Sequence, residues 1–104
     1  MPEFSTPFAG MNAPRRLSHP ELVRSIRFMI AAEYEAIQLY MQLAEATDHP
    51  LAQTVLKDIA DEERIHAGEF LKLLNILDPA EAGFYRSGAG EVVEMQEKQT
   101  GEQP

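Results

Sequence analysis

The sequence predicts an all-α protein in which an antiparallel two-helix hairpin is followed by a short C-terminal helix. Two observations carry this prediction. Apolar residues recur in alternating steps of four and three along two long stretches, which is the period at which packed helices contact each other. The break between the stretches, Thr47-Asp48-His49-Pro50, is so short that the helices must run antiparallel. The 104 residues suffice for one small domain, which we place at residues 18–98.

The first helix is predicted to begin after Ser18, which caps it, with Glu21 three residues further on as in a capping box. Pro20 is tolerated in the first turn, and neither glycine nor proline follows until the helix ends near Ala46. Residues 1–17 hold three prolines and no helical period, so we interpret them as an irregular arm. One apolar row, here called the first seam, has Glu33 as its only charged member: Leu22, Ile26, Ile30, Glu33, Ile37, Tyr40 and Ala44.

The second helix is predicted from about Pro50 to Leu77, with Asp48 or His49 as its cap. Pro79 ends it, and the glycines that follow predict a loop over 82–90, a short helix over 91–98 and a disordered tail over 99–104. Its apolar row, the second seam, is also polar at the centre: Ala52, Leu56, Ile59, Glu63, His66, Phe70, Leu73 and Leu77.

Composition excludes several classes of function. The net charge of −8 argues against nucleic acid as a partner, because contacts to phosphates need clustered lysine and arginine. The absence of cysteine excludes disulfides, thiolate zinc sites and iron–sulfur ligation. No run approaches the ~18 apolar residues of a membrane span. Because the N-terminus also lacks the apolar core of a signal peptide, we expect a cytoplasmic protein.

The polar members of the two seams are predicted to meet. If the hairpin turns near residue 48, positions whose numbers average about 48 lie at the same height; Glu33 and Glu63 average 48, and Glu33 and His66 average 49.5. A buried carboxylate costs several kcal/mol unless it is paired or binds a metal. One metal ion explains all three groups, and a buried polar cluster that fixes helix register is the alternative.

A single chain offers only half of a known metal site. Di-iron carboxylate bundles use two single Glu residues and two Glu-x-x-His pairs, one element from each of four helices. Glu33 and the pair Glu63–His66 supply one element of each kind. Two copies related by a two-fold axis would therefore complete a four-helix bundle, in which the Glu63 carboxylates would bridge two metal ions on the axis. Carboxylate and imidazole ligands suit Fe, Mn or Zn.

Two segments resemble a known family. Glu33-Tyr34-Glu35-Ala36-Ile37-Gln38-Leu39-Tyr40, followed thirty positions on by Asp61-Glu62-Glu63-Arg64-Ile65-His66-Ala67, is similar to the encapsulated ferritin family, over roughly residues 20–95. The resemblance implies a ferritin-like four-helix bundle formed by a homodimer, and a homodecamer of five dimers. It also implies a ferroxidase that oxidises Fe(II) to Fe(III) for iron storage and detoxification, inside the nanocompartment of an encapsulin shell protein in the cytoplasm.

The same resemblance assigns roles to individual residues. Glu33, Glu63 and His66 match the iron ligands, and Tyr40 matches a tyrosine near the centre. Glu35 matches a carboxylate that helps metal reach the centre, although its partner carboxylate is replaced by Ala32.

Other interpretations stay open. Tyr40 could simply pack in the first seam. Glu35 and Glu62 are the candidate path for incoming metal, but ordinary solvent-exposed acidic residues are the better explanation of both. A rubrerythrin-like di-metal peroxidase would use the same centre, but the absence of cysteine removes its usual electron-relay module. In a non-enzymatic metal-binding scaffold, the cluster of Glu33, Glu63 and His66 would only fix the pairing of the helices. The C-terminal tail does not resemble the cargo peptide of some members, and others are fused to the shell, so the shell partner is implied by the family alone.

Overall fold

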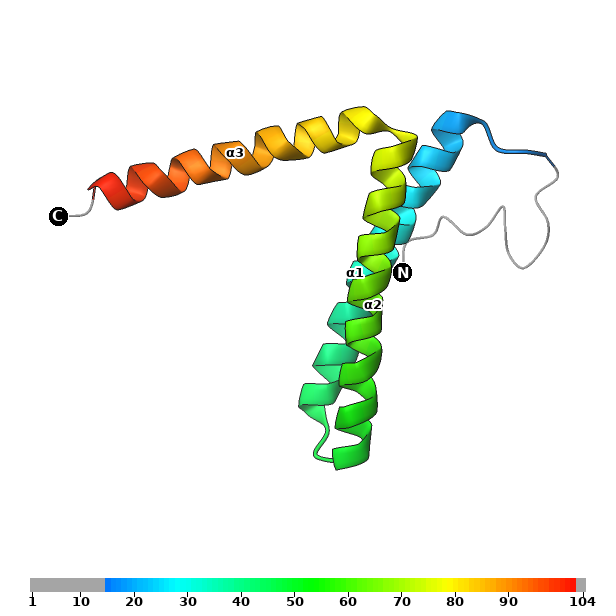
Figure 1. The fold of residues 1–104 in the computed structure, drawn as a ribbon. Coiled ribbons are helices and arrows are strands. Elements are labelled where there is room, and N and C mark those ends of the chain that lie inside the picture. Colours follow the sequence, from blue (N-terminus) through cyan, green and yellow to red (C-terminus); the bar gives the residue numbers. More distant parts are fainter. Residues whose placement is uncertain (1–14, 103–104) are drawn as a thin grey trace.

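Three helices make up the described part of the chain (Figure 1). The computed structural model describes residues 15–102, and its helices are α1 (His19–Ala46), α2 (Pro50–Leu77) and α3 (Pro79–Glu102). The first two lie side by side and antiparallel, as predicted, and α3 projects away from one end of this hairpin (Figure 1). The predicted arm and tail fall partly on residues 1–14 and 103–104, which lie outside the described residues.

The helix ends confirm the predicted caps. The Ser18 hydroxyl accepts a hydrogen bond from the Glu21 amide at 3.3 Å, and the Ser18 amide donates to the Glu21 carboxylate at 2.8 Å. His49 rather than Asp48 caps α2, because its Nδ1 accepts a hydrogen bond from the Ala52 amide at 3.2 Å. At the far end of the hairpin, His19 Nε2 donates to the Leu77 carbonyl at 2.8 Å and ties the two helices together.

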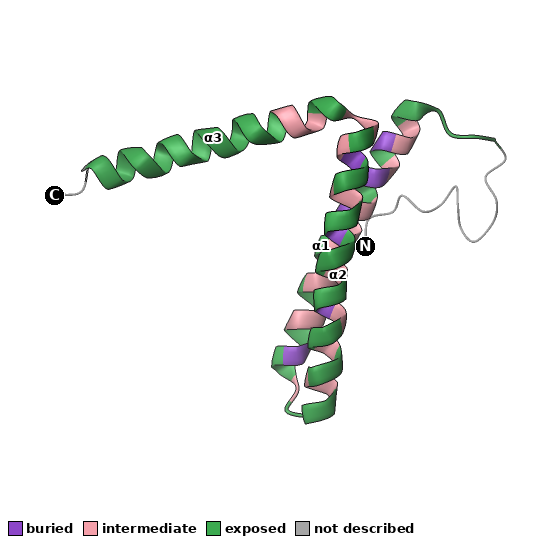
Figure 2. Cartoon of the chain, in the orientation of Figure 1, coloured by how far each residue is buried: buried purple, intermediate pink, exposed green. Residues whose placement is uncertain are grey.

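The hairpin core is small and lies along one line between the helices (Figure 2). On α1 the first seam is buried at Ile26, Ile30 and Ala44, as predicted. On α2 the buried residues lie one position beyond the predicted Ile59, His66 and Leu73: they are Ala60, Ala67 and Leu74. Because each residue turns a helix by about 100°, the second seam points partly away from α1 and toward one open face of the hairpin.

The C-terminal third is a single helix, so the predicted loop over 82–90 and the disordered tail over 99–102 are wrong. Asp78 alone separates α2 from α3, and Pro79 opens the new helix, where a missing amide costs nothing. A glycine inside a helix costs about 1 kcal/mol relative to alanine, which weakens the helix but does not end it. None of the described glycines has the positive φ that would turn the chain.

A charged cluster anchors the base of α3 to α1. Arg27 Nη2 donates to Glu81 at 2.7 Å and lies 3.5 Å from Asp78, and the Tyr85 hydroxyl donates to the same Glu81 carboxylate. The hydrogen bonds from Arg27 and Tyr85 lower the pKa of Glu81, and the bond to Glu81 raises the pKa of Tyr85. The ionised form of Glu81 therefore favours this contact between α1 and the base of α3.

Acid is expected to loosen this anchor. The pKa of Glu81 is lower in the folded than in the unfolded chain. Its contribution to the stability of the folded chain is therefore complete above the ordinary carboxylate pKa, and it is lost as the pH falls through the pKa of the folded state. The chain has no cysteine, so spin labels can be attached at Lys57→Cys and Lys98→Cys without background. The distance distribution between them should broaden at acid pH, and Glu81→Gln should broaden it already at pH 7. A distribution independent of both changes would contradict the anchor.

None of the described helices combines the length and the apolar character that crossing a membrane requires.

Candidate metal centre

The structure brings the three polar seam residues together. Glu33 lies on α1, and Glu63 and His66 lie one turn apart on α2. One ligand atom from each residue falls within 4.8 Å of the other two. The predicted register is therefore correct, and within the described range 15–102 this is the one group of three or more His, Asp or Glu side chains with such geometry.

His66 lies between the two carboxylates of the cluster. Its Nδ1 atom lies 3.5 Å from Glu63 Oε2 and 3.8 Å from Glu33 Oε2. These separations are too long for good hydrogen bonds, but an ion placed among the three atoms could contact all of them. The two carboxylates are mostly buried, with 19% and 17% of their side chains exposed, whereas the imidazole is 48% exposed. The cluster thus has a covered carboxylate side and an open imidazole side.

One carboxylate atom has no hydrogen-bond partner. Glu33 Oε2 is buried and makes no hydrogen bond to any described residue. Such a buried acceptor is costly unless something satisfies it, and carboxylate oxygen and imidazole nitrogen are a donor set that suits Fe, Mn or Zn. The residues present therefore fit a metal ion.

A groove of about 370 Å³ lies beside the cluster on the open face of the hairpin. Phe70 and Leu73 are its apolar lining, and Glu33 and His66 of the cluster also line it. Glu69 also lines it, although it belongs to neither seam. Its position one turn after His66, on the same side of α2, accounts for this.

The other predicted site residues lie outside the cluster. Tyr40 is half-buried two turns beyond Glu33, and no described hydrogen bond links it to the three ligands. Glu35 is half-buried and Glu62 is exposed, and neither belongs to the group of ligand atoms. The predicted roles of Tyr40 near the centre and of Glu35 and Glu62 on the path of incoming metal stay predictions.

The chain is similar in sequence and in fold to known proteins. The family model for rubrerythrin matches residues 25–101. The crystal structure of the encapsulated ferritin domain from Pyrococcus furiosus superposes with a TM-score of 0.78 at 36% sequence identity, covering 84% of this chain and 89% of that one. The chain belongs to the encapsulated ferritin family.

Two longer relatives carry related sequences. An encapsulin nanocompartment cargo protein, EncC of Myxococcus xanthus, is 44% identical over 82 residues, which is 79% of this chain and 62% of the relative. A ferritin-like–encapsulin shell fusion protein of Pyrococcus furiosus is 36% identical over 85 residues, 82% of this chain but 25% of the relative. This encapsulated ferritin chain thus spans less than two thirds of either relative.

Proposed function

We propose that this chain is half of a ferroxidase centre, which two copies complete as a homodimer around a di-iron site. The observation that carries the proposal is the unpartnered Glu33 Oε2, buried beside Glu63 and His66 on an open face of the hairpin. A cost in stability of this kind is expected where function requires it. The family supports iron as the metal, since the chain matches the rubrerythrin model and an encapsulated ferritin domain.

The open face explains why two chains are needed. One chain offers three ligand atoms, fewer than the four to six that Fe or Zn takes, and the groove beside them is open. A second copy, related by a two-fold axis that passes near Glu63, would bring the same three residues to the other side of the site. Its apolar residues would also cover Phe70 and Leu73, which line the groove.

In the proposed reaction Fe(II) is the substrate, Fe(III) is the product and dioxygen takes the electrons. Glu33, Glu63 and His66 of each chain would hold the iron, and the two chains together would supply six ligand residues. Carboxylates are hard anionic donors, so they favour Fe(III) and thereby the oxidation. His66 lines the groove and its imidazole is half-exposed in one chain, so this side of the site is where the second copy's ligands would approach.

The shell partner and the assembly are also part of the proposal. The relatives are named as an encapsulin cargo protein and as a ferritin-like–encapsulin fusion. We place this chain accordingly inside an encapsulin compartment in the cytoplasm, where the shell stores the Fe(III) product, and we expect a homodecamer of five dimers.

Aerobic addition of Fe(II) tests the proposal. The wild-type chain should oxidise Fe(II) much faster than buffer, with dioxygen consumed in parallel, and Glu63→Ala should fall to the rate of buffer. Glu45→Ala removes an exposed carboxylate of α1 far along the helix from Glu33 and should keep the wild-type rate. Equal rates for wild type and Glu63→Ala would reject the ferroxidase; binding of iron without consumption of dioxygen would favour a scaffold. Fast consumption of peroxide but not of dioxygen would favour a peroxidase.

A further inference from the structure

Glu69 is a side chain of the groove beside the metal centre that has no role in the cluster or in the hairpin core. Of the five residues that line this groove, Glu33 and His66 belong to the cluster and Phe70 and Leu73 are apolar, which leaves Glu69. Its side chain is exposed in one chain, and within residues 15–102 no hydrogen bond or ion pair holds its carboxylate. This carboxylate is therefore available to accept a hydrogen bond.

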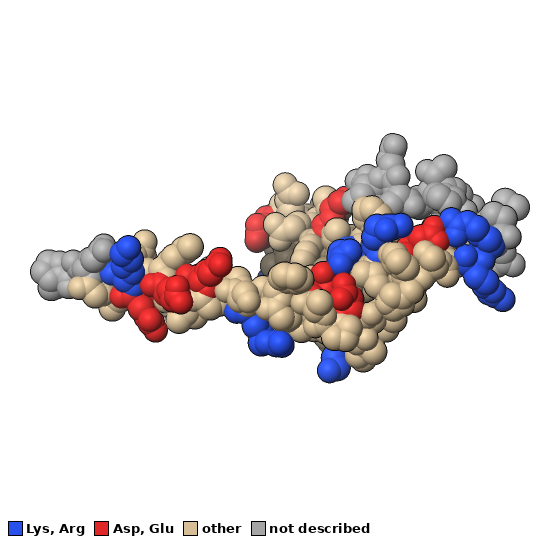
Figure 3. Space-filling model, turned by 90° about the horizontal axis from the view of Figure 1, so that it is seen from above, with Lys and Arg blue, Asp and Glu red and all other residues tan. Residues whose placement is uncertain are grey.

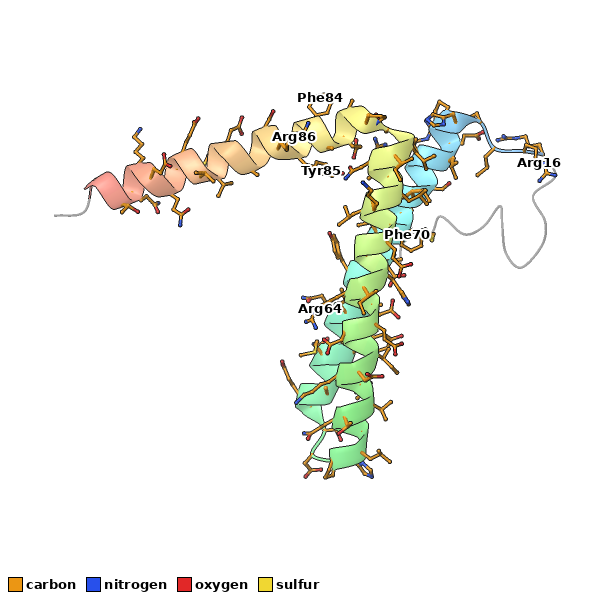
Figure 4. The ribbon with its side chains drawn as sticks, viewed as in Figure 1. Arg16, Arg64, Phe70, Phe84, Tyr85 and Arg86 are labelled. Atoms are coloured by element: carbon orange, nitrogen blue, oxygen red, sulfur yellow. The ribbon has the colours of Figure 1, made fainter. Side chains whose placement is uncertain are left out.

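Negative charge alone does not distinguish Glu69. The chain carries 17 acidic residues, and acidic atoms gather along the projecting helix α3 in Figure 3. The position of Glu69 does distinguish it, because it lies one turn after His66 on α2. Phe70 of the same groove and Arg64 lie on opposite sides of the hairpin (Figure 4), and the nearest base in sequence, Lys72, forms no ion pair with Glu69 in the described structure.

The imidazole of His66 has two nitrogens with different surroundings. Its Nδ1 atom lies 3.5 Å from Glu63 and 3.8 Å from Glu33, so Nδ1 is the nitrogen that can bind an ion held by these carboxylates. A ring nitrogen binds a metal through its lone pair, which leaves the ring proton on Nε2. A metal-binding histidine almost always donates this second N–H to a carboxylate, a backbone carbonyl or water.

Glu69 is placed to be that acceptor. Side chains of a helix lean back over the preceding turn, so the Glu69 carboxylate extends over the turn that holds His66. The same rule brings His66 toward Glu63, where the structure shows the contact at 3.5 Å. The other side-chain acceptor of the groove, Glu33, lies on the Nδ1 side of the ring. Because the imidazole is 48% exposed, packing within one chain does not by itself fix the ring.

We propose that Glu69 is a positioning residue of the metal centre: it accepts a hydrogen bond from His66 Nε2–H and thereby keeps the Nδ1 lone pair directed at the ion. The inference rests on the metal centre proposed above. A carboxylate on the second nitrogen fixes the orientation of the ring and makes it a stronger donor to the metal, and loss of such a partner typically weakens metal binding by about 10–100-fold. In this arrangement Glu69 does not touch the ion.

Binding of Zn(II), which has no redox chemistry, tests this role separately from Fe(II) oxidation. Glu69→Ala should weaken binding of Zn(II) to the full chain by about 10–100-fold, measured by competition with a chelator at equal oligomer mass. Glu69→Gln keeps an acceptor oxygen at the same side-chain length and should restore most of the affinity. Asp58→Ala is the matched control: it removes a charge from an exposed position on the same side of α2, about three turns before Glu69, and should bind Zn(II) as the wild type does.

The variants separate a hydrogen bond from simple attraction of cations. If Glu69→Gln binds as weakly as Glu69→Ala, and added salt removes their difference from the wild type, Glu69 acts only through its charge and the proposal is overturned. Equal affinities of the wild type and Glu69→Ala would also overturn it, but would leave the metal centre intact. A wild type that binds no Zn(II) would reject the centre itself, and the role of Glu69 with it.

A crystal structure of the Zn(II)-loaded wild type tests the contact directly. A Glu69 oxygen should lie about 2.7–3.2 Å from His66 Nε2, with Nδ1 on the ion. A water molecule or a group of the second copy at Nε2 would overturn the proposal, and so would a Glu69 oxygen bound to the ion, because Glu69 would then be a ligand. Neither result depends on whether the centre oxidises iron.

Discussion

Replacing Glu33 by leucine is expected to abolish Fe(II) oxidation and, at the same time, to stabilise the metal-free chain. Glu33 Oε2 is buried without a hydrogen-bond partner, and only 17% of the side chain is exposed. A buried polar group that lacks its hydrogen bond costs about 1–3 kcal/mol, and an apolar side chain of similar size removes that cost. A domain of this size gains about 4–8 °C in Tm for each kcal/mol.

Two variants separate the effects on function and stability. Glu33→Gln keeps the shape and a polar group, so it should lose oxidation without the full gain in Tm. Glu45→Leu makes the same change to leucine at an exposed position of α1 and should leave both Tm and oxidation near the wild-type values. Unfolding is followed by circular dichroism in the presence of a chelator. A Glu33→Leu chain that melts below the wild type would show that the carboxylate is satisfied without metal.

The hairpin could be predicted from sequence because its determinants are local. Ser18 and Glu21 form their capping box within one turn, and His49 and Pro50 start α2 immediately after the break. With so short a connection, antiparallel packing fixes which residues share a height. This alone suffices to predict that Glu33 lies close to Glu63 and His66.

The second seam was predicted one residue early for a physical reason. A stripe with steps of four and three is broad, and on α2 it serves two purposes: Ala60 and Leu74 pack against α1, whereas His66 and Leu73 are left on the open face. The sequence shows that the stripe is apolar, but not which of its edges faces α1. Small buried alanines carry a weak hydrophobic signal, although they decide how closely the helices approach.

The continuous helix α3 could not be predicted, because its local sequence favours a loop whereas a contact with a distant part of the chain favours the helix. Glycine-rich sequence over 83–90 favours a loop, whereas the anchor from Arg27 to Glu81 joins residues 54 positions apart. Nothing in the local pattern indicates such a contact. The exposed apolar residues that follow, such as Val92, gain stability only if another surface covers them.

If the site needs two chains, a single substitution at Leu73, which is not a ligand, should remove Fe(II) oxidation. Leu73 is 39% exposed and lines the groove beside His66. If a second copy covers this groove, Leu73→Arg forces a long charged side chain into an apolar contact at a cost of about 3 kcal/mol, which weakens association about 100-fold. Ile76→Arg is the control: Ile76 is 63% exposed and does not line the groove, so the same charge there should weaken association less.

Dilution gives the same test without a mutation. Below the dissociation constant of the dimer, the fraction of chains in dimers falls in proportion to concentration, so the oxidation rate per chain should fall about tenfold for each tenfold dilution. Leu73→Arg should shift this dependence to higher concentration and leave the helix content unchanged, because the side chain points away from the hairpin core. A monomeric Leu73→Arg chain that oxidised iron at the wild-type rate would show that Glu33, Glu63 and His66 of one chain suffice. The half-site, and with it the need for two chains, would then be wrong.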